Sequence, residues 1–288
     1  MKRLFAPVSF EGRSIEWDYR LRREAPFSGF YHWHPCFEVL FVHEGAGTVI
    51  VNQIAYEIRR GMMFVFQPFQ LHKVYPKPGP DRPYIRTKLH FVPEEMADKL
   101  KHFPQRYGVL QRLWEERNAM FAWDLREHVD YVEQLFQRYE KLRAGEAGSS
   151  EEDDALLLLQ LLSVVQEADS GSEHGDSAGI VRRPLRYSEK IMRWIEEHFA
   201  EEISLERIAE ETHLSKFYVS RIFRAETGSS LTDYLTARRI KHACRLLQTT
   251  TLPVERIGAE VGLPDASYFV QLFKKVIGTT PLKYRNQG

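Results

Sequence analysis

Two kinds of hydrophobic periodicity divide this chain of 288 residues. In roughly the first ninety residues, apolar side chains alternate with polar ones or form short runs rich in β-branched and aromatic residues, which is typical of β-strands. In roughly the last eighty, they recur at intervals of three and four residues, which is typical of amphipathic helices. We therefore predict an α+β protein of two domains, with the β domain first.

The N-terminal pattern predicts a series of short antiparallel strands separated by turns rich in Gly and Asn. When such strands close into a small barrel, their edges are paired rather than exposed. The interior of such a barrel can hold one small ligand. The predicted strands span residues 37–42, 48–51, 55–58, 62–66 and 84–92.

Helical spacing begins in the middle of the chain, over residues 109–118, 125–142 and 154–165. Each of these segments carries an apolar stripe that needs a partner surface. The stripes could pack on the barrel within one chain or pair two chains into a dimer, and both arrangements need the same residues. The spacing alone leaves both arrangements open.

A stretch rich in Gly, Ser and acidic residues surrounds the last of these helices, and no Lys or Arg occurs between Glu146 and Asp176. Such a composition is typical of solvated linkers, and this one ends near Arg183. We therefore divide the chain into a barrel over residues 1–95, a helical region over 96–168, a linker over 169–185 and a C-terminal domain over 186–288.

The C-terminal domain contains an internal repeat with a displacement of fifty residues. Each copy has the spacing of a helix, a turn and a second helix, over about residues 204–226 and 253–276. Ser204 and Ser215 precede the helices of the first copy as N-caps, and a glycine that turns left-handed is expected to close each copy. The matched residues are Phe223, Gly228 and Tyr234 in the first copy and Phe273, Gly278 and Tyr284 in the second.

The second helix of each copy carries polar and basic residues on the face opposite its apolar stripe. Arg and Gln read base edges, whereas Lys and Arg neutralise phosphates. Two such helices could enter successive major-groove segments about 34 Å apart on one face of DNA. The outward residues are Lys216, Ser220, Arg221 and Arg224 in the first copy and Ser267, Gln271, Lys274 and Lys275 in the second.

The distribution of charge supports this interpretation, although the whole chain has 40 basic and 40 acidic residues. Residues 204–288 hold 13 Lys and Arg residues against 8 Asp and Glu residues, a net charge of +5. No apolar segment is long enough for a signal peptide or a membrane span, and Cys36 and Cys244 lie in different predicted domains. We therefore expect a cytoplasmic protein with reduced thiols and no membrane partner.

Many residues of the C-terminal domain match a known family pattern in order. They include Ile208-Ala209, Leu214-Ser215, Phe223-Arg224, Thr227-Gly228, Arg238-Arg239-Ile240, Val261-Gly262, Phe273-Lys274-Lys275 and Thr280-Pro281. With these residues, the segment 186–286 resembles the DNA-binding domain of the AraC/XylS transcription regulators. The resemblance implies base contacts from Phe217, Ser220 and Arg221 in the first copy and from Ser267, Val270 and Gln271 in the second.

The resemblance also implies what the chain binds and how it works. We expect a transcription regulator that binds double-stranded promoter DNA and responds to a small effector in the barrel, and we do not expect an enzyme. In the family, helices after the barrel commonly join two chains, so we favour a homodimer, and contact with RNA polymerase is a further expectation. One departure is Gly258, which stands where the family usually has alanine and weakens its helix by about 1 kcal/mol.

A second resemblance, to the cupin signature, covers about residues 29–73 and rests on His32, His34, Glu38, Gly45, Gly61, Pro68 and His72. Residues two apart on a strand share a face, so the His and Glu side chains could point together into the barrel. Three imidazoles and a carboxylate suit Zn(II), Fe(II), Ni(II) or Mn(II). The alternative function is therefore a metal-binding cupin sensor, or a cupin-type metalloenzyme fused to a DNA-binding module.

The same residues have a reading without a metal, which we favour, so no cofactor is required. Pro35 interrupts the strand and could turn the histidines away from Glu38. His32, Trp33, His34, Glu38 and His72 are then the candidate effector contacts, and the aromatic side chains nearby suit a sugar ring or another planar ligand. The alternating set Tyr84, Arg86, Lys88 and His90 is expected to be a solvated face.

Overall fold

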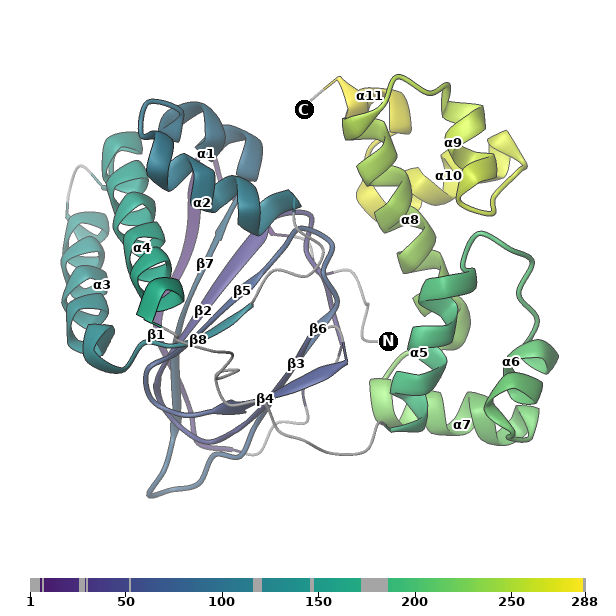
Figure 1. Ribbon diagram of the computed structural model, residues 1–288, viewed down its shortest axis with the longest axis horizontal. Coiled ribbons are helices and arrows are strands. Elements are labelled where there is room, and N and C mark those ends of the chain that lie inside the picture. The colour runs from purple at the N-terminus through teal and green to yellow at the C-terminus, as the bar shows by residue number, and fades with distance from the viewer. Residues whose placement is uncertain are drawn as a thin grey trace. The chain divides into compact units, whose positions relative to one another are not determined.

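The computed structural model describes residues 6, 8–25, 29, 31–51, 53–115, 121–145, 148–171 and 186–286. The chain forms two compact units, one built mainly from residues 33–182 and the other mainly from residues 183–288. The first unit contains β-sheets flanked by helices, and the second is helical (Figure 1). The predicted α+β class, with the β domain first, is confirmed.

Antiparallel pairing joins the strands of the N-terminal unit into two sheets, with the orders β1-β7-β2-β5-β8 and β4-β3-β6. The five predicted strands are confirmed to within two residues at their ends, whereas β1, β6 and β8 were not predicted. The bounds are β1 (Ile15–Arg23), β2 (Phe37–Glu44), β3 (Gly47–Val51), β4 (Ile54–Ile58), β5 (Met62–Phe66), β6 (His72–Pro76), β7 (Tyr84–Phe91) and β8 (Ala122–Asp124).

An apolar layer lies between the two sheets and forms the interior of the barrel. Leu40 and Phe64 belong to it from the five-stranded sheet, and Val49 and Ile58 belong to it from the three-stranded sheet. Because successive side chains of a strand point to opposite faces, the neighbours of these residues point out of the barrel. The predicted cupin-like barrel is therefore built from both sheets.

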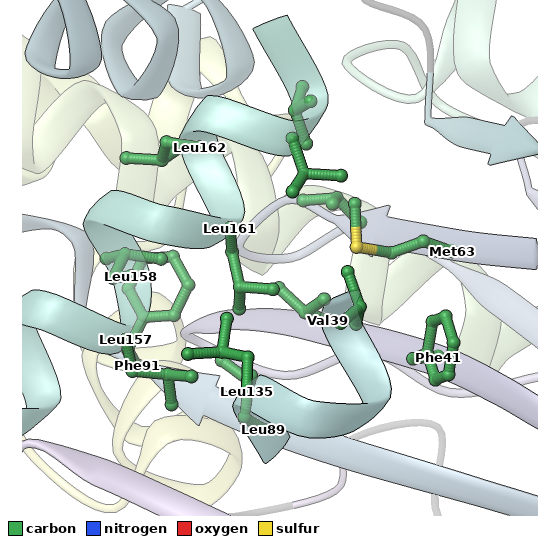
Figure 2. Close-up of a cluster of buried hydrophobic side chains, with 14 of the residues drawn as sticks. Val39, Phe41, Met63, Leu89, Phe91, Leu135, Leu157, Leu158, Leu161 and Leu162 are labelled. Atoms are coloured by element: carbon green, nitrogen blue, oxygen red, sulfur yellow. The ribbon is translucent and has the colours of Figure 1, made fainter. Parts of the chain in front are cut away.

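The outer face of the five-stranded sheet is covered by helices, and its apolar residues form the larger core of this unit (Figure 2). Val39 and Phe41 of β2 contribute to this core, together with Leu158 and Leu161 of α4. Burying one such side chain stabilises the fold by about 1.5 to 3 kcal/mol. The helices are α1 (Pro93–Leu100), α2 (Pro104–Glu115), the 3-10 turn η1 (Arg126–His128), α3 (Val129–Ala144) and α4 (Glu151–Gly171).

The middle helices thus use their apolar stripes within the chain, which is one of the two arrangements that the spacing left open. Helices α3 and α4 confirm the segments 125–142 and 154–165, and α2 covers 109–115 of the segment 109–118, whose last three residues lie outside the described ones. None of the described helices, the leucine-rich α4 included, is both long and apolar enough to cross a membrane. Dimerisation stays a prediction.

Two boundaries differ from the expected ones in detail. Strand β8, at 122–124, pairs with β5, so the sheet takes a strand from the region expected to be only helical. Helix α4 continues to Gly171, so the first residues of the expected linker are helical, and its residues 172–185 lie outside the described part of the chain. The helical region is therefore continuous with the barrel, because β8 extends the five-stranded sheet and the helices cover the outer face of that sheet.

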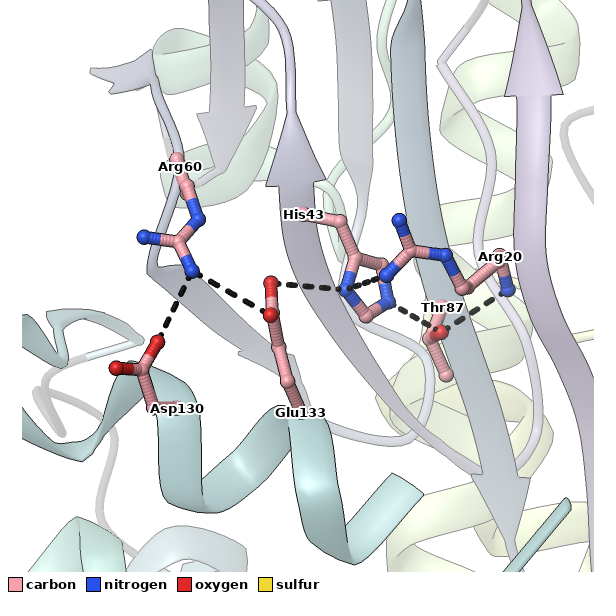
Figure 3. A network of polar contacts seen from close by, with 6 residues as sticks. All are labelled: Arg20, His43, Arg60, Thr87, Asp130 and Glu133. Atoms are coloured by element: carbon pink, nitrogen blue, oxygen red, sulfur yellow. Dashed lines mark hydrogen bonds and ion pairs between the residues drawn. The ribbon is translucent and has the colours of Figure 1, made fainter. Parts of the chain in front are cut away.

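A polar network attaches α3 to the sheet (Figure 3). The Nε2 atom of His43 on β2 lies 2.7 Å from the Thr87 hydroxyl, and its Nδ1 atom lies 3.4 Å from a carboxylate oxygen of Glu133 on α3. Arg60 also pairs with Glu133, at 3.3 Å. Burial and the nearby guanidinium of Arg20 lower the pKa of His43 to about 4, so this imidazole is neutral at pH 7.

The described part of the C-terminal unit consists of helices, and it contains two similar helix-turn-helix motifs. Helices α6 and α7 make the first helix-turn-helix, α9 and α10 make the second, and α8 connects them (Figure 1). These elements match the predicted motifs at 204–226 and 253–276. The bounds are α5 (Tyr187–His198), α6 (Leu205–Thr212), α7 (Lys216–Thr227), α8 (Leu231–Thr249), α9 (Val254–Glu260), α10 (Ala266–Ile277) and α11 (Pro281–Arg285).

The fifty-residue repeat of the sequence is also a repeat of side-chain packing. Phe223 meets Tyr234 edge to face, with ring centroids 5.7 Å apart and an interplanar angle of 68°. Phe273 meets Tyr284 in the same way, at 5.6 Å and 70°. Both phenylalanine side chains are fully buried. The matched residues therefore form the core of each copy, as the repeat predicted.

The predicted helix ends are also confirmed. The hydroxyl oxygens of Ser204 and Ser215 accept hydrogen bonds from backbone N–H groups in the first turns of α6 and α7. Gly228 and Gly278 end α7 and α10 with φ angles of 81° and 94°. At Gly258, a Cβ atom would lie 2.9 Å from the Leu263 carbonyl oxygen. Glycine in place of alanine therefore lets α9 lie close to the backbone of Leu263 in the second helix-turn-helix.

Candidate functional site

Helix α7 exposes the residues that the sequence predicted for its outer face. Val219 and Phe223 on the opposite face are buried. Phe217 is 82 % exposed, which leaves an aromatic ring in solvent at the start of the helix. A large apolar side chain in that position is available to a partner surface such as a thymine methyl. The exposed residues are Lys216, Phe217, Ser220, Arg221 and Arg224.

Helix α10 repeats this arrangement on the second copy. Ser267, Gln271, Lys274 and Lys275 are exposed, and Val270 is half-buried. Tyr268, which was not among the expected contacts, is 54 % exposed and adds an aromatic ring to this face. Tyr268 corresponds to Tyr218 of the first copy, which is half-buried, so the repeat did not indicate that Tyr268 is exposed.

Two basic side chains on the exposed face of α7 make contacts with neighbouring residues. The guanidinium of Arg221 lies over the ring of Tyr218, 5.5 Å from its centroid, which limits the freedom of the long side chain. The ammonium of Lys216 lies 3.2 Å from a carboxylate oxygen of Glu206 on α6. An exposed pair of this kind is weak, so a phosphate group could replace the carboxylate at little cost.

Glu38 is the centre of a buried polar cluster in the N-terminal unit. Its Oε2 atom lies 3.0 Å from Nε2 of His34 and 3.3 Å from Nε2 of both His72 and His90. All four side chains are buried. Three imidazoles therefore converge on one carboxylate oxygen.

The strands bring these residues together from distant parts of the chain. Glu38 on β2 is opposite His90 on β7, so their side chains share the inner face of the five-stranded sheet. His72 begins β6 in the other sheet, and His34 lies just before β2. Pro35 does not turn His34 away from Glu38, contrary to the expected effect, because β2 begins only after it, at Phe37.

Backbone carbonyls orient two of the imidazoles. The Nδ1 atom of His34 lies 2.8 Å from the carbonyl oxygen of Ala6, and Nδ1 of His72 lies 3.0 Å from that of Gln70. A carbonyl oxygen can only accept, so each Nδ1 carries a proton and donates it. The other ring nitrogen, Nε2, faces Glu38 in both residues. Phe66 stacks on the ring of His72, with centroids 3.9 Å apart, and keeps this orientation.

Burial and the contacts with the imidazoles shift the pKa of Glu38 in opposite directions. Burial raises the pKa of Glu38, but the contacts with the three imidazoles outweigh this effect and hold the pKa well below its ordinary value. Burial lowers the pKa of His72. At pH 7 the cluster therefore contains an ionised carboxylate and a neutral His72 imidazole.

The residues of the cupin signature are brought together. Donor atoms of His32, His34, Glu38 and His72 all lie within 4.8 Å of one another. Trp33, the remaining candidate effector contact, is buried, with its ring centroid 5.5 Å from that of Phe69.

The expectation of a solvated face on β7 was wrong for two residues. Tyr84 and His90 are 2 % and 5 % exposed, because this face of β7 is covered inside the barrel. Arg86 and Lys88 between them are half-buried, and Lys88 pairs with Asp18 at 2.9 Å. The alternation in the sequence correctly put these side chains on one face, but it did not indicate that the face was internal.

Two family models match the chain. One describes an AraC-like ligand binding domain and matches residues 19–162, which include most of the barrel and helices α1 to α3. The other describes a helix-turn-helix domain and matches residues 208–287, which include both helix-turn-helix motifs.

Several known proteins are similar to this chain. The HTH-type transcriptional activator RhaS of Escherichia fergusonii is 27 % identical over 259 residues, which cover 88 % of this chain and 86 % of that protein. The arabinose operon regulatory protein of Escherichia coli K12 is 27 % identical over 242 residues, or 84 % of this chain and 77 % of that protein. The regulatory protein SoxS of Escherichia coli K12 is 31 % identical over 97 residues, or 34 % of this chain and 91 % of that protein.

Proposed function

The chain belongs to the AraC/XylS family of DNA-binding transcription regulators with an N-terminal ligand-binding domain, and we propose that α7 and α10 are its two recognition helices. Each helix would lie in the major groove, and the two would read successive segments of one promoter. We further propose that the protein works in the cytoplasm as a regulator and not as an enzyme.

One observation supports this proposal most directly. The two helices bury equivalent phenylalanines, Phe223 and Phe273, and expose the opposite face, where side chains able to read bases lie beside basic ones. The proposed base contacts are Phe217, Ser220, Arg221, Ser267, Val270 and Gln271, and the proposed phosphate contacts are Lys216, Arg224, Lys274 and Lys275. Homodimerisation and contact with RNA polymerase stay predictions.

The variant Arg221→Ala should weaken specific DNA binding by about 1 to 3 kcal/mol and relax the base preference, because a guanidinium can donate two hydrogen bonds to a guanine edge. Fluorescence anisotropy with promoter and scrambled duplexes measures both effects. Lys274→Ala is the contrast, since losing a phosphate contact should weaken binding to both duplexes and lower the salt slope by about one unit. Arg256→Ala, which changes an exposed arginine on α9, should leave affinity nearly unchanged. Equal effects of Arg221→Ala on both duplexes would remove Arg221 from the base contacts.

The proposed effector site lies in the barrel. The hydroxyl of Tyr84 is buried and has no hydrogen-bond partner among the described residues, so a polar group of an effector would satisfy it. The effector contacts proposed from the sequence are His32, Trp33, His34, Glu38 and His72.

A panel of monosaccharides and small organic acids should contain a ligand that raises the melting temperature of the wild-type protein. The variant Tyr84→Phe should bind that ligand about threefold to tenfold more weakly, as expected for one lost hydrogen bond. Thermal-shift titrations of both proteins provide the comparison. A ligand that stabilises both equally would place the effector away from Tyr84.

A further inference from the structure

We propose that Arg239 and Gly262 form a clasp that fixes the distance and the relative rotation of α7 and α10, so that the protein selects DNA sites by the spacing of their two segments. This inference rests on the proposed function, because it takes α7 and α10 as the two recognition helices. Helix α8 already connects the two helix-turn-helix motifs along the chain. The clasp is a second connection between them, and it is made through the end of α5.

Helix α5 is attached to the first recognition helix. The ring of Tyr187 on α5 meets that of Tyr218 on α7 edge to face, with centroids 5.9 Å apart. The backbone N–H of Ser188 also donates to a carboxylate oxygen of Glu226 on α7, at 2.9 Å. Both contacts are in the first turn of α5. Because a helix is a stiff element, a contact at the other end of α5 also constrains α7.

Arg239 on α8 makes such a contact. Its Nε atom donates to the carbonyl oxygen of Phe199 and its Nη2 atom donates to that of Glu201, each at 2.8 Å. The last carbonyl groups of a helix have no partner within the helix and carry partial negative charge, so a guanidinium group satisfies both needs. The guanidinium carbon of Arg238 also lies 4.4 Å from the centroid of the Phe199 ring. Two arginines therefore fix the end of α5 to α8.

The turn of the second helix-turn-helix lies against the same end of α5. Gly262 is in this turn, between α9 and α10. A Cβ atom on Gly262 would lie 2.7 Å from the carbonyl oxygen of Ala200 and 3.0 Å from Nη2 of Arg239. The second motif therefore meets the end of α5 at Gly262, beside the guanidinium group that holds that end.

The first copy indicates that this glycine serves the contact rather than the shape of the turn. His213 has the matching position, because in both copies the N–H of the next residue donates to the carbonyl five residues before it, at 2.9 and 2.8 Å. Both residues are left-handed, with φ angles of 54° for His213 and 77° for Gly262. A histidine fits the turn where it is exposed. At Gly262 a side chain would meet α5, so the two copies differ where only the second forms a clasp.

The first test measures spacing selectivity with the full-length protein and a duplex that the wild type selects from a random-sequence library. Hydroxyl-radical footprinting should show two protected segments, and one base pair is then inserted between them. The insertion moves one segment by about 3.4 Å and rotates it by roughly 35° relative to the other. Wild type should bind the longer duplex at least about tenfold more weakly, whereas Arg239→Ala and Gly262→Ala should lose about threefold or less.

The ratio of the two affinities separates positioning from a loss of stability. A variant that is only less stable would bind both duplexes more weakly and keep the wild-type ratio. Two controls should also keep it: Arg245→Ala, which changes an exposed arginine on α8, and His213→Ala, which puts alanine in the matching turn of the first copy. A wild type that tolerates the insertion would overturn the proposal, and so would clasp variants that keep the wild-type ratio.

The second test measures the separation of the recognition helices without DNA. Spin labels attached to Ala225→Cys and Lys275→Cys, at matched exposed positions of α7 and α10, report this distance by electron paramagnetic resonance. Both native cysteines are buried, which favours labelling of the introduced ones. The distance distribution should be narrow in the otherwise wild-type protein and broader when Arg239→Ala or Gly262→Ala is added. Equal widths, or a broad distribution without either change, would contradict the clasp.

Folding of each variant is checked by circular dichroism. If Arg239→Ala is unfolded, Arg239→Lys takes its place, because it keeps the charge but loses the planar fork that reaches two carbonyl groups. The two tests also distinguish this inference from the proposed function. A footprint with one protected segment would contradict the reading of two segments, and spacing selectivity would be refuted with it. Two protected segments with a tolerated insertion would leave the recognition helices in place and refute only the clasp.

Discussion

Replacing Phe273 with alanine is expected to lower the free energy of unfolding of the C-terminal unit by about 3 to 5 kcal/mol and to abolish specific DNA binding. The side chain is fully buried, and its ring meets those of Phe269 and Tyr284 at centroid distances of 5.9 and 5.6 Å. Truncation removes this contact area and leaves a cavity between α10 and α11. Since a domain has only about 5 to 15 kcal/mol of net stability, this loss is a large fraction of it.

The matched control is Phe217→Ala, because Phe217 is the same residue type but 82 % exposed. It should change stability by no more than about 0.5 kcal/mol and still weaken DNA binding. Urea denaturation followed by far-ultraviolet circular dichroism measures the stability, and fluorescence anisotropy measures the binding. If Phe273→Ala proved as stable as Phe217→Ala, the claim that the matched phenylalanines form the core of each copy would be wrong.

The variant Gly47→Ala is expected to destabilise the N-terminal unit by at least about 3 kcal/mol. Gly47 begins β3 with a φ angle of 146°, a conformation that side chains with a Cβ atom rarely adopt. A Cβ atom there would lie only 2.1 Å from the Tyr75 carbonyl oxygen, on the backbone of β6. The backbone must move to relieve this overlap, and the pairing of β3 with β6 would be disrupted.

Gly79→Ala provides the comparison, since a Cβ atom on Gly79 would meet no atom within 4 Å. It should leave stability within about 0.5 kcal/mol of wild type. Intrinsic fluorescence reports mainly on this unit, which contains the tryptophans Trp17, Trp33, Trp114 and Trp123. Unchanged unfolding of Gly47→Ala would mean that β3 and β6 tolerate a shift in their backbones.

Sequence pattern predicted those elements whose environment is simple. Strand β5 reads as a continuous apolar run because the helices cover one of its faces and the barrel interior covers the other, and all five of its residues are buried. The unpredicted strand β1 lies at the edge of its sheet and alternates with charged residues such as Glu16, Asp18 and Arg22. Charged edge strands resist pairing with other molecules, but their sequence resembles a loop. Strand β8 has three residues and becomes a strand only through its pairing with β5.

The buried cluster shows a different limit. His34 and Glu38 are four residues apart and could be linked by a motif, but His90 reaches Glu38 only through the register of β7 against β2. The alternation from Tyr84 to His90 places these side chains on one face of β7. Whether that face meets solvent depends on the second sheet, whose strands lie elsewhere in the sequence.

The sequence by itself determined the two-domain order, the repeated helix-turn-helix and most of the residues on the exposed faces of α7 and α10, although it missed Tyr268. A helix has one period, so the buried phenylalanines of the repeat already define the opposite face. Only the tertiary structure decided that the middle helices cover the sheet and that His90 joins His34, Glu38 and His72 inside the barrel. Those contacts join strands from different parts of the chain, and their partners are set by strand pairing and closure, which local periodicity does not encode.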